Sequence, residues 1–322
     1  MKKYRYLILL SLPFFLASCS AVTAKTYDVN DYRVMLDYKE GFKIMQLTDL
    51  HFAVQTDYQA VTSYLSKNIK NSAPDLIVLT GDVFMDADSS IVRNVLNFIN
   101  TFNIPFAFNY GNHDHQGSYG FYFINDYLKT LNNSLLIDFS DDDIFGCANY
   151  FIDLMAGTKI MYRLYIVDSG SYHYNGIDFD YDVIHDDQLT HMEKINKEDG
   201  TAPSLAFYHI PLYEERDAFA AVTSGENTNF KGTNNEKVCV GYKRTDAFSR
   251  MKNIGVVGHF FGHDHINYSD ILYNGVTLTY GLKSTPEIYN DDDLIGYKEI
   301  TLNSAQTWGL SNIETKVVSY GK

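Results

Sequence analysis

The stretch Gly111-Asn112-His113-Asp114 follows directly after the apolar run 106–110 and brings together an amide, an imidazole and a carboxylate. Gly and Asn favour turns for backbone reasons, so this stretch alone is equally compatible with a simple turn that closes a strand. Similar polar residues follow four other predicted strands. The fold and the function therefore depend on whether these five strand ends meet.

The residues before this stretch alternate between strand and helix patterns. Apolar runs predict strands at 42–47, 75–79 and 104–110, and apolar residues three and four apart predict helices at 57–70 and 89–102. That order favours parallel strands joined by crossover helices. Open sheets of this kind bind ligands beyond the carboxyl ends of their strands, which is where the polar residues lie.

The second half of the chain predicts a mixture of strands and helices. In chain order we expect a helix at 119–131, an antiparallel pair at 149–155 and 160–167, a helix at 186–197, a strand at 204–208, a helix at 244–252 and a strand at 255–261. Short strands at 271–273, 276–280, 297–302 and 314–318 predict a second, mostly antiparallel sheet. Residues 223–241 are rich in Asn, Thr and Gly and predict a long surface loop.

The five strand ends carry side chains that bind metals. They are Asp49, His51, Asp82, Asn112, His209, His263 and His265. Asp49 with His51, and His263 with His265, are two residues apart, so in an extended chain each pair points the same way. Nitrogen and oxygen ligands without a thiolate suit Mn, Zn or Fe. Seven ligands are too many for one tetrahedral ion, but they suffice for two ions that share a carboxylate.

Five motifs in this order resemble the calcineurin-like metallophosphoesterase superfamily: Asp49-Leu50-His51, Gly81-Asp82, Gly111-Asn112-His113-Asp114, His209-Ile210-Pro211 and Gly262-His263-Asp264-His265. The resemblance spans residues 42 to about 282 and is nearest the purple-acid-phosphatase-like branch. It implies an α/β fold, a four-layer αββα sandwich with two central mixed sheets. Purple acid phosphatases with a tyrosine-ligated ferric ion have Gly and Tyr where this chain has His51 and Met85, so that iron site is not expected.

The resemblance also implies a role for each motif residue. One metal would be held by Asp49, His51, Asp82 and His265, and the other by Asp82, Asn112, His209 and His263, so that Asp82 bridges. Two cations lower the pKa of a shared water, whose hydroxide would attack phosphorus. His113 would act as general acid on the leaving oxygen, a step worth about 100- to 10,000-fold, and Asp114 would orient its ring.

These roles predict a metal-dependent phosphoric-ester hydrolase, with phosphate monoesters as the favoured substrates. Phosphodiesters and nucleotides stay open as alternatives, because no residue identifies the leaving group. A catalytically inactive surface protein that keeps the fold as a binding module is the alternative from a different class. The net charge of −14 disfavours nucleic acid as a partner, and therefore also a nuclease that acts on long duplexes.

The N-terminus predicts export and lipid anchoring. Lys2, Lys3 and Arg5 precede a short apolar run, which is typical of a signal peptide over residues 1–18, with a retained signal anchor as the alternative. Leu16-Ala17-Ser18-Cys19 resembles the lipobox of bacterial lipoproteins, so Cys19 is the predicted lipidation site and the membrane a predicted partner. Residues 19–31 then form a tether, and 32–322 the metallophosphoesterase domain. We expect an extracytoplasmic protein anchored to a bacterial membrane.

Several residues have no assigned role at this point. Cys147 and Cys239 are expected to be buried free thiols rather than a disulfide, although an exported protein permits either. His115 and the pair Tyr172-His173 are the candidates for contact with the substrate. The acidic runs at 141–143 and 291–293 lack a calcium-loop pattern and are expected to be solvated turns.

Overall fold

The computed structural model describes residues 26–28, 32–117, 120–137, 144–304 and 308–320. The predicted signal peptide, Cys19, most of the tether and the acidic run at 141–143 lie outside these ranges. Among the described residues, no helix is both long enough and apolar enough to cross a membrane.

The first of two central sheets has five strands in the order β16-β15-β3-β4-β5. Its strands are β3 (Phe42–Leu47), β4 (Leu76–Thr80), β5 (Phe106–Asn109), β15 (Gly296–Leu302) and β16 (Ile313–Val317). The first three are parallel to one another, as the alternating pattern predicts, while β15 and β16 add antiparallel strands at one edge. Every residue of β4 is buried, because helices cover one face of the sheet and the second sheet covers the other.

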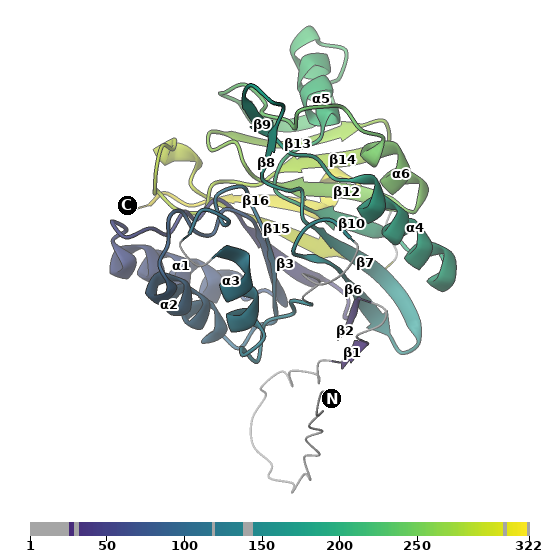
Figure 1. The fold of residues 1–322 in the computed structure, drawn as a ribbon. Coiled ribbons are helices and arrows are strands. Elements are labelled where there is room, and N and C mark those ends of the chain that lie inside the picture. The colour runs from purple at the N-terminus through teal and green to yellow at the C-terminus, as the bar shows by residue number, and fades with distance from the viewer. Residues whose placement is uncertain (1–25, 29–31, 118–119, 138–143, 305–307, 321–322) are drawn as a thin grey trace, which may run out of the picture.

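Three helices cover the outer face of this sheet: α1 (Tyr58–Ser72), α2 (Ser89–Asn100) and α3 (Gly120–Leu128) (Figure 1). Asp57 and Asp88 are the N-caps of α1 and α2, because their carboxylates accept hydrogen bonds from backbone N–H groups of the first turn. Each helix then buries one apolar stripe, for example Val61 and Leu65 in α1, against the sheet.

The second sheet has nine strands in the order β1-β2-β6-β7-β10-β12-β14-β13-β11. They are β1 (Thr26–Asp28), β2 (Arg33–Asp37), β6 (Asn149–Ala156), β7 (Lys159–Val167), β10 (Ser204–Phe207), β11 (Phe230–Asn234), β12 (Val256–Phe261), β13 (Asn267–Tyr273) and β14 (Val276–Tyr280). The helices α4 (Asp186–Asp199), α5 (Tyr213–Ser224) and α6 (Ala247–Asn253) lie on its outer side (Figure 1). The sheet contains both parallel and antiparallel pairs, so it is mixed.

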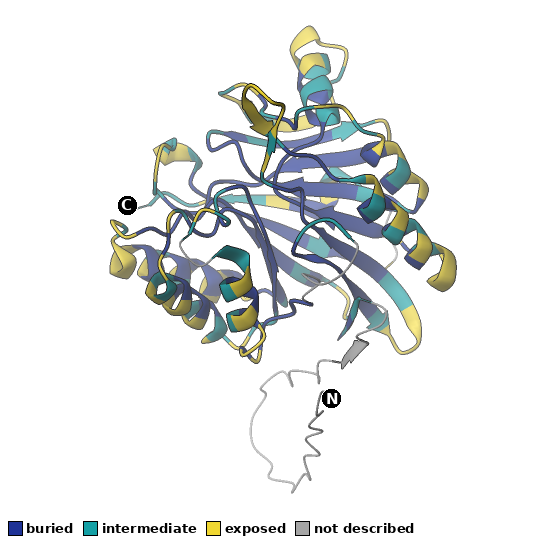
Figure 2. Ribbon diagram, viewed as in Figure 1, coloured by how far each residue is buried: buried dark blue, intermediate teal, exposed yellow. Residues whose placement is uncertain are grey.

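The two sheets stack face to face, and their strands form the buried centre of the molecule (Figure 2). One apolar core combines side chains of both sheets with those of α1 and α2, and a second core lies under α4, α5 and α6. The predicted four-layer αββα sandwich with two central mixed sheets is therefore confirmed.

Two predictions about the second half were wrong, and one element was missed. The strands near the C-terminus do not form a sheet of their own, because β13 and β14 join the second sheet and β15 and β16 join the first. The expected loop at 223–241 begins in the last turn of α5 and contains β11, which pairs with β13. A two-stranded hairpin, β8 (Tyr172–Tyr174) with β9 (Phe179–Tyr181), was not predicted.

Cys147 and Cys239 are separate free thiols, as expected. Only Cys147 is buried, whereas Cys239 is half-buried. A disulfide between them is therefore not part of this fold.

Candidate metal centre

All seven predicted metal ligands follow the carboxyl ends of strands. Asp49 and His51 follow β3, Asp82 follows β4, and Asn112 follows β5, all in the five-stranded sheet. His209 follows β10, and His263 and His265 follow β12, in the nine-stranded sheet. The site thus forms where the carboxyl ends of β3, β4 and β5 meet those of β10 and β12 from the other sheet. All seven residues are buried.

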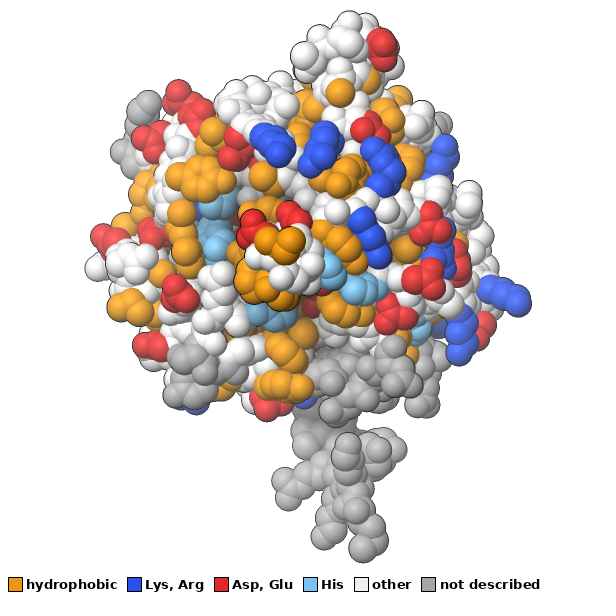
Figure 3. Space-filling model, turned by 45° about the horizontal axis from the view of Figure 1, so that its top comes forward, with side chains coloured by type: hydrophobic (Ala, Val, Ile, Leu, Met, Phe, Trp, Pro, Cys, Tyr) orange, Lys and Arg blue, Asp and Glu red, His pale blue; other side chains and the backbone are white. Residues whose placement is uncertain are grey.

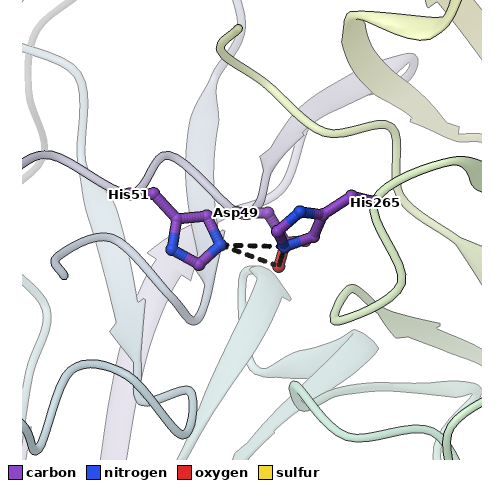
Figure 4. Close-up of side chains that lie close together, drawn as sticks. All are labelled: Asp49, His51 and His265. Atoms are coloured by element: carbon purple, nitrogen blue, oxygen red, sulfur yellow. Dashed lines mark hydrogen bonds and ion pairs between the residues drawn. The ribbon is translucent and has the colours of Figure 1, made fainter. Parts of the chain in front are cut away.

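One group of ligand atoms comes from Asp49, His51 and His265 (Figure 4). The Nε2 atoms of His51 and His265 lie 2.9 Å apart, and Asp49 Oδ1 lies 3.8 Å from the first and 3.7 Å from the second. Two ring nitrogens and a carboxylate oxygen thus face the same small volume, which is the arrangement of a chelating site.

A second group comes from Asp82, His209 and His263. Asp82 Oδ2 lies 3.1 Å from His209 Nε2 and 3.8 Å from Nε2 of His51 in the first group. The Asp82 carboxylate therefore stands between the two groups, where a shared ligand of two ions would be.

Unsatisfied buried atoms support a fit to metal ions. Asn112 Oδ1 and His263 Nε2 are buried and have no hydrogen-bond partner, although buried polar atoms nearly always have one. Asn112 directs its other amide atom, Nδ2, to the hydroxyl of Tyr172 at 2.9 Å. These residues fit a pair of cations bound by nitrogen and oxygen, as the sequence predicts.

The protonation of three of the four imidazoles also fits. Burial lowers the pKa of His51 and of His263 well below the usual range and lowers the pKa of His265 to about 3. All three rings are therefore neutral at physiological pH, which is the form that binds a metal. For His209, burial acts in the same direction, but the Asp82 carboxylate outweighs it and raises the pKa to about 10.

The backbone of the site differs from the expected extended chain. Asp49, His51, Asp82 and His263 all have positive φ, between 49° and 87°, a conformation that non-glycine residues seldom adopt. Asp49 and His51 belong to the same group, whereas His263 and His265 fall in different groups. The prediction that each pair points at one place was therefore wrong for the second pair.

Glycines allow the strand ends to approach one another. A Cβ at Gly81 would lie 2.7 Å from the His209 ring and 2.7 Å from the backbone nitrogen of Gly111. A Cβ at Gly111 would collide with Asp82. Gly111 thus makes room for the Asp82 carboxylate and Gly81 for the His209 ring, which gives both a steric role beyond turn formation.

His113 lies beside the ligands, but Asp114 does not orient it. The His113 ring is half-buried, lies 5.3 Å from the His51 ring, and its Nδ1 contacts Gln116 Oε1 at 2.8 Å. The Asp114 carboxylate instead accepts hydrogen bonds from the backbone N–H groups of Phe84 and Gly111, at 2.9 and 2.8 Å. The expected contact between Asp114 and the His113 ring was wrong, because the turn needs that carboxylate for its own backbone.

Of the three residues proposed to contact substrate, Tyr172 reaches the site and the two histidines do not. The His115 ring packs against Tyr110 and Phe121, and the His173 ring stacks on Tyr242 at 3.7 Å, so neither imidazole joins the ligand groups. Tyr172 does reach the site, through Asn112.

Lys283 is a site residue that the sequence did not reveal. Its buried Nζ donates to the backbone carbonyl of Asp49 at 2.8 Å, and burial lowers its pKa to about 8. It follows β14 as a single lysine without a surrounding motif, so no pattern distinguishes it from a surface lysine. Its positive charge offsets part of the negative charge of Asp49 and Asp82.

Comparisons with known proteins agree with this geometry. The sequence model of calcineurin-like phosphoesterases matches residues 42–267. Probable inactive purple acid phosphatase 14 of Arabidopsis thaliana is 26% identical, covering 84% of this chain and 77% of the relative. Phosphatase DCR2 of Saccharomyces cerevisiae is 28% identical, covering 87% of this chain but only 53% of the relative, so the chain spans about half of that protein.

A solved structure shows the same fold. The crystal structure of a dimetal phosphatase from Danio rerio aligns with a TM-score of 0.51 and 12% identity, covering 88% of this chain and 100% of that one. At this identity the likeness concerns the fold alone. Because the family match covers more than half of the residues, including all five strand-end motifs in full, the chain belongs to the calcineurin-like phosphoesterase family and is a metal-dependent phosphoesterase.

Proposed function

We propose that this chain is a two-metal phosphatase that hydrolyses phosphate monoesters. The observation that carries the proposal is the position of Asp82 Oδ2 between His209 Nε2 of one ligand group and His51 Nε2 of the other. A carboxylate in that position can be shared by two ions, an arrangement used to hold both the attacking and the leaving oxygen of a phosphoryl transfer.

The ligands would divide into two sets. Asp49, His51 and His265 would hold one cation, Asn112, His209 and His263 the other, and Asp82 both; Mn, Zn and Fe suit these donors. When bound, the cations would acidify the attacking water and neutralise the phosphoryl oxygens.

The chain's own residues would supply the proton transfer. The hydrogen bond described for the His113 ring joins Nδ1 to the amide oxygen of Gln116, and none is described for Nε2. Nε2 is therefore available to protonate the leaving oxygen of a substrate bound at the metals. In the imidazolium form both ring nitrogens carry a proton. Nδ1–H then donates a hydrogen bond to the Gln116 amide oxygen, which holds the ring in place, and the proton on Nε2 passes to the leaving oxygen.

Phosphate monoesters are favoured because relatives such as DCR2 are named phosphatases. Diesters and nucleotides are the alternatives within the same chemistry. A protein that keeps the fold and lacks turnover is the other alternative, which relatives named as probable inactive phosphatases make specific.

The test is a panel of monoesters, diesters and nucleotides assayed with Mn, Zn or Fe, with metal analysis of the same samples. We expect turnover of at least one monoester, and we expect His113→Ala to lower it by about 100- to 10,000-fold while two metals stay bound. Full turnover in that variant would contradict the assignment of His113. A wild type that binds two metals and hydrolyses no ester would support the inactive alternative.

We also propose that the chain is lipidated at Cys19 and held outside the cytoplasm on a bacterial membrane. The signal-like residues 1–18 and the sequence Leu16-Ala17-Ser18-Cys19 support this location. Mass spectrometry of the mature protein should find an N-terminal acylated cysteine, and Cys19→Ser should release the protein from the membrane fraction. Persistence of residues 1–18 in the mature protein would contradict this proposal.

A further inference from the structure

The hairpin β8–β9 projects over the metal centre. Figure 3 shows it as a protruding group of hydrophobic and acidic side chains with histidines gathered around its base. Tyr181 on β9 packs edge-on against the His263 ring, with centroids 4.2 Å apart. Tyr242 holds the hairpin from the other side, through its stack on His173 and a hydrogen bond to the carbonyl of Tyr181.

The base of the hairpin is bound to Asn112 twice. Ser171 Oγ donates to the backbone carbonyl of Asn112 at 3.1 Å, and the hydroxyl of Tyr172 accepts from Asn112 Nδ2 at 2.9 Å. The Tyr172 hydroxyl also lies 3.5 Å from Gln116 Nε2, the amide whose oxygen contacts His113. The Tyr172 hydroxyl therefore lies between Asn112, a proposed metal ligand, and Gln116, which contacts the proposed general acid His113.

Neither of these hydrogen bonds uses the O–H hydrogen of Tyr172. Asn112 Nδ2 and Gln116 Nε2 are both donors, so the phenol oxygen accepts from both. Among the contacts described for Tyr172, none is an acceptor for its own O–H. The side chain is 39% exposed, so this O–H can turn toward a molecule that enters the site.

The oxygen of a phosphoryl group is the acceptor that fits this position. A substrate held between His113 and Asn112 would present anionic oxygens close to Tyr172, and hydrogen bonds to charged acceptors are about twice as strong as those between neutral groups. On the basis of the proposed function, we propose that Tyr172 is a substrate-binding residue whose O–H donates to a phosphoryl oxygen of the ester and of inorganic phosphate. The hairpin β8–β9 is then part of the active site, because it positions this donor.

Tyr172→Phe tests the proposal, since it removes only the hydroxyl. Tyr174→Phe is the matched control, because Tyr174 lies on the same strand, is 56% exposed and has no described contact with the ligand groups. The readouts are the Kd of inorganic phosphate for the Mn-loaded protein by calorimetry, the metal content, and kcat and KM for an aryl phosphate.

We expect Tyr172→Phe to weaken phosphate binding by about 10- to 100-fold, as for loss of one hydrogen bond to a charged group, with two metals still bound. Tyr174→Phe should bind phosphate like the wild type. Unchanged phosphate binding in Tyr172→Phe would overturn the proposal, and so would loss of metal in that variant, because Tyr172 would then act only by holding Asn112. The Kd of phosphate tests the role of Tyr172 even if the wild type hydrolyses no ester. Turnover of the wild type tests the proposed function, so the two proposals can fail independently.

Discussion

Gln116 occupies the position beside His113 that the sequence assigned to Asp114. The amide oxygen of Gln116 lies 2.8 Å from His113 Nδ1, and its side chain is exposed. Gln116 is therefore a positioning residue, which affects the reaction through the orientation of the imidazole.

We expect Gln116→Ala to lower kcat by about 10-fold, with little change in KM, because the ring of the general acid loses its orientation. The loss should be greater for an alkyl phosphate, whose leaving oxygen needs a proton, than for p-nitrophenyl phosphate. Gln116→Glu keeps the acceptor oxygen and should restore most of kcat. An equal loss of kcat for both esters would show that Gln116 does not act through His113.

The candidate site shows which residues a sequence reveals. Each predicted ligand follows a predicted strand and belongs to a short motif, and every motif except His209-Ile210-Pro211 also contains glycine or a second ligand, so position and chemistry coincide. Gln116 and Lys283 have no such motif, and the fold brings them to the site. Tyr172 also lacks a motif, and the sequence proposed it only as a candidate for contact with the substrate. Asp114 belongs to the central motif, yet its hydrogen bonds show a backbone role that residue type alone does not distinguish from catalysis.

At the scale of elements, strong periodicity made prediction possible. α1, α2 and β4 were predicted because their apolar residues recur at helical spacing or form a continuous buried run. α5 has few buried apolar residues, β11 consists mostly of exposed or half-buried polar residues, and β8 and β9 have three residues each. These elements depend on partners elsewhere in the chain, and a local pattern does not contain that information.

α5 carries a buried carboxyl group that makes stability depend on pH. Glu215 Oε1 accepts from Ser269 Oγ on β13 at 2.7 Å, and burial raises the pKa of Glu215 to about 8. Between the ordinary carboxyl range and pH 8, the folded state binds a proton that the unfolded chain has released. The free energy of unfolding therefore falls as pH rises through this window.

Glu215→Gln removes this titration. We expect the variant to gain stability relative to the wild type as pH rises from 5 to 9, by an amount on the order of 4 kcal/mol. Urea unfolding at a series of pH values measures the difference. Glu226→Gln, at an exposed glutamate just beyond α5, is the control and should show no such trend. A constant difference between wild type and Glu215→Gln would mean that Glu215 is ionised in the folded state.

At the scale of the whole molecule, the metal centre joins the two sheets. Asp49, His51 and Asp82 come from the five-stranded sheet, and His209, His263 and His265 from the nine-stranded one. Buried amides connect the same region, since Asn109 on β5 donates to the carbonyl of Val167 on β7 at 2.8 Å. Ions bound here would therefore stabilise the contact between the layers as well as the site.

Removal of metal should consequently destabilise the entire domain. We expect chelation to lower Tm and Mn to restore it, with about 2.7 kcal/mol of stabilisation for each site at a free metal concentration 100 times Kd. Differential scanning calorimetry measures the shift, and Asp82→Asn should weaken the response because it alters the shared ligand. A Tm that is the same with and without metal would show that the layers do not depend on the ions.

The layer order of the molecule was predictable, but its strand order was not. The family resemblance implied four layers, and the apolar patterns placed most of the strands. β15 pairs with β3, which places Lys298 opposite Gln46 although the two residues lie near opposite ends of the sequence. Such a pairing depends on which strand of each sheet has an unpaired edge. The local sequence patterns of the short strands near the C-terminus are similar, so they do not show which edge each strand joins.

The positive φ angles of Asp49, His51, Asp82 and His263 have an evolutionary consequence. A non-glycine residue in this conformation costs about 1–3 kcal/mol. In a descendant that no longer uses the metals, replacement by glycine would relieve that cost, so selection for stability would favour it. These four positions would then be among the first to change, and carboxylates and imidazoles that persist there mark a lineage in which the site is still under selection.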